Sequence, residues 1–143
     1  MEVTRHEIRE LALQTLYSMG SNNDLSEQES IQNVLEYKLK TDELTEAIPE
    51  YLEFLVNGVN QSQKGLDEKI APKLGKKWTI DRLPKMSLVI LRLGLFEILY
   101  SNEVPQKVAI NEAIELAHQY SDPDDASFIN AVLSNFIDDK NAG

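Results

Sequence analysis

The chain contains no cysteine. This absence excludes disulfide bonds, thiol nucleophiles and the Cys-based zinc and iron–sulfur sites. Its 143 residues also lack any uninterrupted apolar run that approaches the roughly 20 residues of a membrane-spanning helix. The first residues, Met1 to Glu7, lack the apolar segment of a signal peptide. We therefore expect a cytoplasmic protein that has no membrane partner.

Catalytic and metal-binding patterns are missing as well. The two histidines, His6 and His118, lie far apart and have no partner at a fixed spacing. Asp122, Asp124 and Asp125 lack the glycine and the distal glutamate of a calcium-binding hand, so we interpret them as turn and helix-cap residues. Because no segment alternates as a strand does, no glycine-rich phosphate loop can follow one. We expect no enzymatic activity, no bound metal and no cofactor.

Positive charge is scarce and unevenly distributed. The chain has 14 Lys and Arg against 24 Asp and Glu, and the net charge of −10 argues against broad affinity for nucleic acids. Acids dominate residues 24–53 and 97–143, whereas residues 64–92 contain eight bases and three acids. Arg5 and Arg9 add positive charge near the N-terminus. Any anion-binding site should draw on the N-terminal segment and on residues 64–92.

Apolar residues recur at three- and four-residue steps along most of the chain, and this spacing predicts amphipathic helices. Met86 to Tyr100 is apolar on nearly all sides, as a buried central helix is. The predicted helical segments are Thr4 to Gly20, Ser26 to Leu39, Ile48 to Ile70, Met86 to Tyr100, Val108 to Tyr120 and Phe128 to Ile137, with a short turn at Ile80 to Leu83. We expect one all-α domain over residues 1–143, with subdomains at about 1–75 and 76–143.

The N-terminal helix is one candidate for binding an anion. Arg5 and Arg9 lie four residues apart, so both should project from one face of this helix. His6 lies beside them, and Glu7 and Glu10 dilute the positive charge. A solvated helix end is the alternative interpretation.

Aromatic residues are the second candidate. Trp78 is flanked by Lys and Arg residues, but a single tryptophan more often fills a core than stacks on a base, so we prefer a core position. Tyr17 and Phe128 could stack on unpaired bases. Phe128 also begins the apolar face of the last helix, which makes core packing its default interpretation.

Four stretches of this sequence resemble the NusB family of transcription antitermination factors. Arg9 to Tyr17 resembles the opening helix of that family, and Ile90 to Ile98 resembles its buried helix. Val104 to Ala117 resembles its most recognisable stretch, and Phe128 to Leu133 resembles its closing helix. The resemblance extends from about Arg5 to Ile137, and the order of the four motifs makes it specific.

The resemblance implies a fold and a function. The family fold consists of two small perpendicular helical bundles, about seven helices in all, joined by the long third helix. Family members bind the boxA element of nascent ribosomal-RNA transcripts as a heterodimer with NusE, which is also a ribosomal small-subunit protein. The complex joins other Nus factors on RNA polymerase and acts against transcription termination.

Site residues follow from the same resemblance. The RNA-binding residues that it implies are Arg5, His6, Arg9, Tyr17, Phe128 and Asn130. Tyr17 and Ser87 are implied as partner-binding residues, and Ser87 stands where an acidic residue often faces the protein partner. The arginine-rich motif of the family is thinned here to Arg5 and Arg9.

Two other functions stay open. The chain could be a helical protein-interaction module that has lost RNA binding. It could also be an accessory domain related to that of ribosomal-RNA cytosine methyltransferases, although this interpretation requires a methyl-donor domain after Gly143.

Overall fold

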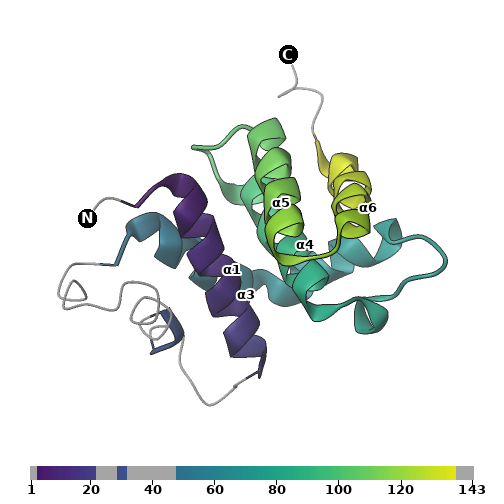
Figure 1. Ribbon diagram of the computed structural model, residues 1–143, viewed down its shortest axis with the longest axis horizontal. Coiled ribbons are helices and arrows are strands. Elements are labelled where there is room, and N and C mark those ends of the chain that lie inside the picture. Colours follow the sequence, from purple (N-terminus) through teal and green to yellow (C-terminus); the bar gives the residue numbers. More distant parts are fainter. Residues whose placement is uncertain (1–2, 22–28, 32–47, 138–143) are drawn as a thin grey trace. The chain divides into compact units, whose positions relative to one another are not determined.

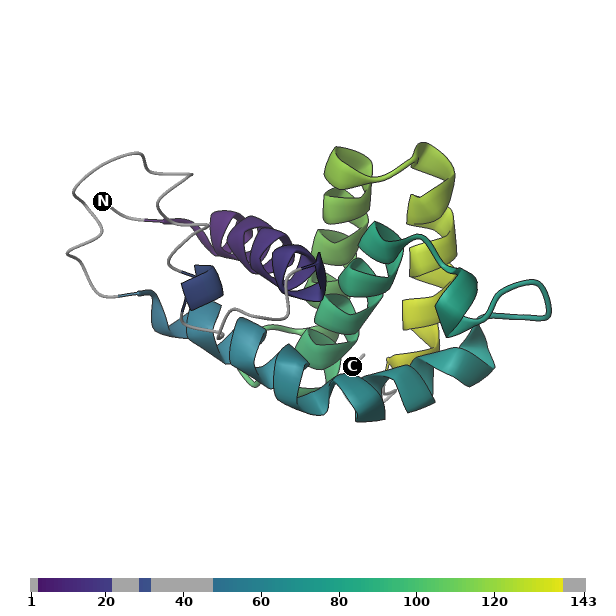
Figure 2. The same cartoon turned by 90° about the horizontal axis from the view of Figure 1, so that it is seen from below.

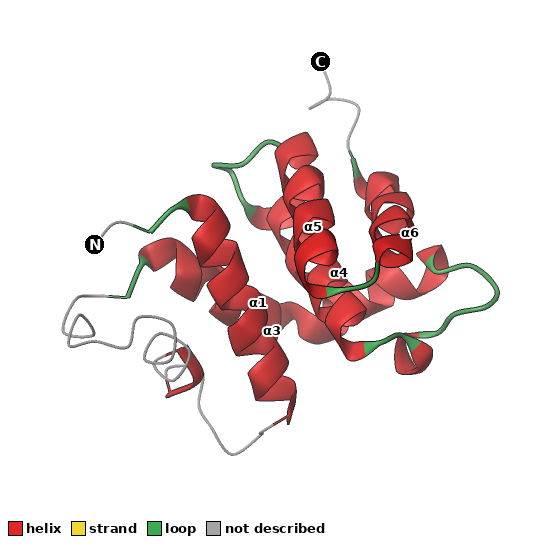
Figure 3. Ribbon diagram, in the orientation of Figure 1, coloured by secondary structure: helices red, strands yellow, loops and turns green. Residues whose placement is uncertain are grey.

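The computed structural model describes residues 3–21, 29–31 and 48–137, and every regular element in these ranges is helical (Figure 3). The predicted all-α class is therefore confirmed. The α-helices with both ends in these ranges are α1 (Arg5–Ser21), α3 (Glu50–Ile70), α4 (Lys85–Tyr100), α5 (Gln106–Tyr120) and α6 (Pro123–Leu133). Short 3-10 helices lie at Ala71–Lys73, Ile80–Arg82 and Ser134–Phe136.

The helix predicted between Ser26 and Leu39 lies mostly outside the described residues. Residues 29–31 of it are helical, and Ser30 and Ile31 are buried. The predicted end of α3 is confirmed, because a 3-10 turn at Pro72 follows the helix and Gly75 adopts a φ of 84°. None of the described helices is both long enough and apolar enough to cross a bilayer.

The chain divides into a first unit, residues Met1–Asn60, and a second unit, residues Gln61–Gly143. The boundary between the two units therefore lies within α3. The sequence-based expectation put the boundary after this helix, near residue 75. The observed boundary lies earlier because the second half of α3 packs into the second unit. Leu66 and Ile70 are almost fully buried, and Asp67 accepts two hydrogen bonds from Arg92 of α4, at 2.7 and 2.8 Å.

The first unit contains α1 and the first half of α3. The buried apolar side chains of α1 occupy one broad side of the helix, as the apolar spacing predicts, and they are Ile8, Leu11, Ala12, Leu13 and Leu16. Those of α3 in this unit are Leu52, Leu55, Val56 and Val59. Both helices therefore have a buried side that is mainly apolar.

The second unit is built around α4. Figures 1 and 2 show α4, α5 and α6 side by side, and each of the three helices packs against the other two. Most residues of α4 are buried, including Leu91 at 0% exposure. The prediction of a buried central helix at Met86 to Tyr100 is therefore confirmed.

Gly94 allows the three helices of the second unit to approach closely. A Cβ atom at this position would lie 2.8 Å from Leu133 Cδ1 of α6 and 3.1 Å from Ala113 Cβ of α5. These separations are shorter than normal van der Waals contact, so a Cβ at position 94 would displace the end of the Leu133 side chain and crowd Ala113. Packing therefore favours glycine here.

Candidate RNA- and partner-binding surfaces

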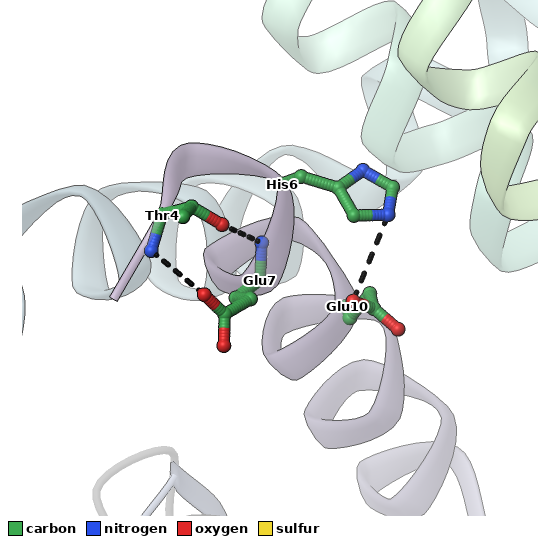
Figure 4. Close-up of polar contacts among 4 residues, drawn as sticks. All are labelled: Thr4, His6, Glu7 and Glu10. Carbon is green, nitrogen blue, oxygen red and sulfur yellow. Dashed lines mark hydrogen bonds and ion pairs between the residues drawn. The ribbon is translucent and has the colours of Figure 1, made fainter. Parts of the chain in front are cut away.

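The N-terminus of α1 is capped by a reciprocal pair of hydrogen bonds between Thr4 and Glu7 (Figure 4). The backbone N–H of Glu7 donates to Thr4 Oγ1 at 3.0 Å, and the backbone N–H of Thr4 donates to Glu7 Oε1 at 3.1 Å. This is the capping-box arrangement, which satisfies two backbone donors at a helix start. Glu7 therefore has a structural role at the turn from which Arg5 extends.

Arg5 is exposed and lies against the ring of Tyr51 from α3. Its guanidinium carbon is 3.9 Å from the ring centroid, which is a cation–π geometry. Tyr51 in turn contacts Phe54, with ring centroids 5.5 Å apart, and Phe54 is itself exposed. The side chain of Arg5 therefore lies on the surface of the first unit, against an aromatic ring.

The two neighbours of Arg5 in the predicted site have different environments. His6 is partly exposed, and its Nε2 lies 3.6 Å from Glu10 Oε1, one turn further along α1 (Figure 4). Arg9, by contrast, is only 2% exposed. The expectation that Arg5 and Arg9 are both exposed is wrong for Arg9, whose position falls on the buried side of α1 between Ile8 and Leu11.

Tyr17 lies in the C-terminal half of α1 and is 37% exposed. It is separated from Arg5 by twelve residues, which corresponds to roughly 18 Å along a helix axis. Helix α1 therefore presents the cation and the aromatic ring as two separate contacts. An extended ligand could reach both, whereas a single nucleotide could not.

Phe128 and Trp78 form an aromatic pair in the second unit. Their ring centroids are 6.3 Å apart and the rings are tilted by 56°, a favourable geometry for two aromatic side chains. Phe128 is half-buried in the first half of α6, and Trp78 is 41% exposed. The interpretation of Trp78 as a core residue is therefore wrong, because it covers one side of Phe128 and leaves much of its own surface to solvent.

Asn130 is exposed on α6, two residues after Phe128. Two residues correspond to roughly 200° around a helix, so the two side chains leave α6 in different directions. Ser134 Oγ donates to Asn130 Oδ1 at 3.3 Å and to the Asn130 backbone oxygen at 2.7 Å. Only the longer of these bonds reaches the side-chain amide, where it involves the oxygen, so the amide nitrogen can supply donors to a ligand.

Ser87 does not lie on the surface. It is 1% exposed in the first turn of α4, and its Oγ lies 3.5 Å from Ser121 Oγ in the α5–α6 connection. Ser121 in turn donates a hydrogen bond to Asp125 of α6. The resemblance implied a partner contact at Ser87, but in this structure the side chain joins three elements of the second unit internally.

The segment between α3 and α4 carries the densest positive charge near these aromatic residues. We define the cationic loop as residues 71–84, whose exposed cations are Lys73, Lys76, Lys77 and Arg82. Its single acidic residue is Asp81. The loop contains Trp78 itself, so the ring and the four charges are presented together.

Metal chemistry has no visible basis among residues 3–21, 29–31 and 48–137. No group of three or more His, Asp or Glu side chains there could hold a metal ion. The exposed groups just described, namely cations, aromatic rings and an oriented amide, are typical of a binding surface. They match what single-stranded nucleic acid offers, which is phosphates, base faces and base edges.

Three features of this surface were not predicted from sequence. The capping box has a readable signal, because Thr and Glu stand three residues apart immediately before the apolar pattern of α1. The contact of Arg5 with Tyr51 and that of Trp78 with Phe128 have no such signal, because the partners lie about 46 and 50 positions apart in the chain.

Comparison with known proteins identifies the family. The NusB family model matches residues 6–138. The transcription antitermination protein NusB of Enterococcus faecalis is 45% identical over 139 residues, which cover 95% of this chain and 90% of the relative. The NusB protein of Latilactobacillus sakei is 46% identical over 136 residues, which cover 94% of this chain and 96% of the relative.

Solved structures agree on the fold. NusB of Thermotoga maritima superposes with a TM-score of 0.80 at 24% identity, covering 95% of this chain and 92% of that one. The solution structure of Aquifex aeolicus NusB gives a TM-score of 0.73 at 26% identity, covering 93% of this chain and 88% of that one. A crystal structure of antitermination factors NusB and NusE in complex with dsRNA gives a TM-score of 0.77 at 24% identity. The match covers 92% of this chain and 94% of the chain in that structure.

These similarities extend along nearly the whole of this chain and of each relative. The relatives are transcription antitermination proteins and not enzymes, so the expectation of a non-enzymatic protein is confirmed. The chain belongs to the NusB family.

Proposed function

We propose that the protein is a transcription antitermination factor that binds boxA RNA of nascent ribosomal-RNA transcripts as a heterodimer with NusE. The observation that carries this proposal is the similarity to a transcription antitermination protein along 95% of the chain. A protein of the same fold has been crystallised with NusE and dsRNA, and this supports the choice of partner and ligand. Other Nus factors and RNA polymerase complete the proposed assembly, which acts in the cytoplasm.

The RNA contacts are assigned to exposed groups in each unit. Arg5 binds phosphate, and His6 lies beside it on α1. Tyr17 and Phe128 offer ring faces to unpaired bases, and Asn130 offers its amide to a base edge or a phosphate. Tyr17 is also proposed to contact the protein partner. Arg9 and Ser87 are left out of the proposed contacts because both are almost fully buried.

Charge makes a partner useful for RNA binding. The net charge of −10 repels a phosphate backbone away from the few exposed cations. A basic partner would face the acidic surface, which steers association, and would extend the positive surface available to the RNA. We therefore expect NusE to raise the RNA affinity at least about tenfold, equivalent to roughly 1.4 kcal/mol of coupling. By reciprocity, RNA should tighten NusE binding by the same factor.

Calorimetry tests this proposal directly. A boxA RNA oligonucleotide is titrated into the free protein and into the protein–NusE heterodimer at one salt concentration, with a scrambled oligonucleotide as the control. We expect boxA RNA to bind the heterodimer at least about tenfold more tightly than it binds the free protein. Equal affinities in the two titrations would refute the cooperative mechanism. Absence of RNA binding in both, with NusE binding retained, would favour a helical protein-interaction module.

A further inference from the structure

An exposed tryptophan next to a proposed RNA-binding residue is unexplained by the contacts assigned above. Trp78 is the single tryptophan of the chain, and it is 41% exposed. A side chain of this size usually buries most of its surface. Trp78 contacts the half-buried Phe128, at a centroid distance of 6.3 Å. An exposed ring therefore lies directly beside the ring that is proposed to bind RNA.

The electrostatic setting of Trp78 favours a polyanion. The cationic loop, which contains Trp78, carries four exposed cations and a single acid, within a protein of net charge −10. Two of the cations, Lys76 and Lys77, immediately precede Trp78 in the chain. Proteins that bind single strands combine such charges, which track the phosphates, with aromatic rings on which bases stack.

The geometry of the ring pair indicates how bases would be held. The two rings are tilted by 56°, so they cannot sandwich one base between parallel faces. They instead offer two ring surfaces with different orientations, which suits bases that are splayed apart in a single strand and not those stacked in a duplex.

We propose that Trp78 stacks on an unpaired RNA base next to the one bound at Phe128, while Lys76 and Lys77 neutralise the flanking phosphates. This inference rests on the proposed RNA binding and adds a specific contact to it. A protein partner could also use an exposed tryptophan, but the excess of cations around the ring favours RNA. The two occupants give different results in the test below.

Three variants of the full chain test the proposal. Trp78→Leu removes the ring face and keeps an apolar side chain, whereas Trp78→Phe keeps a ring that can stack. Tyr100→Leu is the matched control, because Tyr100 is an aromatic residue of the second unit with 49% exposure and lies at the end of α4, outside the cationic loop. Circular dichroism and thermal unfolding establish that each variant is folded.

Affinity for single-stranded boxA RNA is the first readout. We expect Trp78→Leu to weaken binding by about 5- to 150-fold, the range for loss of one stacked base. Trp78→Phe should recover most of that loss, and Tyr100→Leu should bind as the wild type does. The emission of the single tryptophan is the second readout, and the single strand should quench it more than a duplex of equal length.

The outcomes separate this inference from the proposed function. Unchanged affinity in Trp78→Leu, with RNA binding by the wild type intact, would overturn the inference and leave the proposed function standing. Loss of NusE binding in Trp78→Leu with unchanged RNA affinity would also overturn it, because the tryptophan would then serve a protein partner. Absence of RNA binding by the wild type, with or without NusE, would remove the proposed function and this inference together.

Discussion

The guanidinium carbon of Arg5 lies 3.9 Å from the centre of the Tyr51 ring. Arg5 begins α1 and Tyr51 lies in the first turn of α3, so this contact joins the two helices of the first unit. The face of an aromatic ring attracts a cation and orients it. The contact therefore orients the guanidinium of Arg5 at the surface of the first unit.

The two arginines of α1 should respond differently to truncation. Arg5→Ala should weaken RNA binding and lower the log–log salt slope by about 0.7, the value for one phosphate contact with a single strand. Arg9→Ala should instead lower the free energy of unfolding by about 1–3 kcal/mol, because it leaves buried polar groups without their partner. RNA titrations at several salt concentrations and chemical denaturation measure the two effects.

Lys107→Ala is the matched control for the Arg5 variant, because it removes an exposed cation from α5, outside both the N-terminal segment and the cationic loop. Its salt slope should equal that of the wild type. The assignment of Arg5 as a phosphate contact would be rejected if Arg5→Ala and Lys107→Ala gave the same slope.

The capping box at the start of α1 should contribute measurably to the free energy of unfolding of the protein. Thr4→Ala removes the hydroxyl that accepts from the Glu7 backbone N–H, and we expect the free energy of unfolding to fall by about 0.5–2 kcal/mol. Thr4→Ser retains the oxygen and should stay within a few tenths of a kcal/mol of the wild type. Urea denaturation of both variants compares them. A loss of equal size in the serine variant would show that the hydroxyl is not the stabilising group.

Two glycines in helices should give opposite results on substitution by alanine. Gly65 in α3 is exposed, and a Cβ there would meet nothing within 4 Å. Gly65→Ala should therefore stabilise the protein by up to about 1 kcal/mol through helix propensity. Gly94→Ala gains the same propensity but forces Cβ against Leu133 and Ala113, and overpacking of this kind costs about 1–3 kcal/mol.

The net result for Gly94→Ala should be destabilisation. Denaturation curves of the two variants, measured side by side, decide the comparison. Stabilisation by both substitutions would contradict the close packing of α4 against α5 and α6 that the structure shows.

Much of the secondary structure was determined by the sequence alone, because helix formation depends on local periodicity and on turn residues. The apolar spacing placed α1 and α4 within one or two residues of their observed bounds. Proline and glycine after α3 marked its end for the same local reason. The resemblance to a known family then predicted the fold and the identity of the family, both of which are confirmed.

Which side chains are accessible was decided only by the tertiary structure. The four-residue spacing placed Arg5 and Arg9 on one side of α1. Two residues on the same side of a helix can nevertheless differ in exposure, because other parts of the fold can cover one of them and not the other. Arg9 is buried and Arg5 is exposed as a result. Ser87 is buried and lies beside Ser121, which is distant in the chain, whereas Trp78 stays 41% exposed although it contacts Phe128, which is also distant in the chain. These are contacts between distant residues, and periodicity carries no information about them.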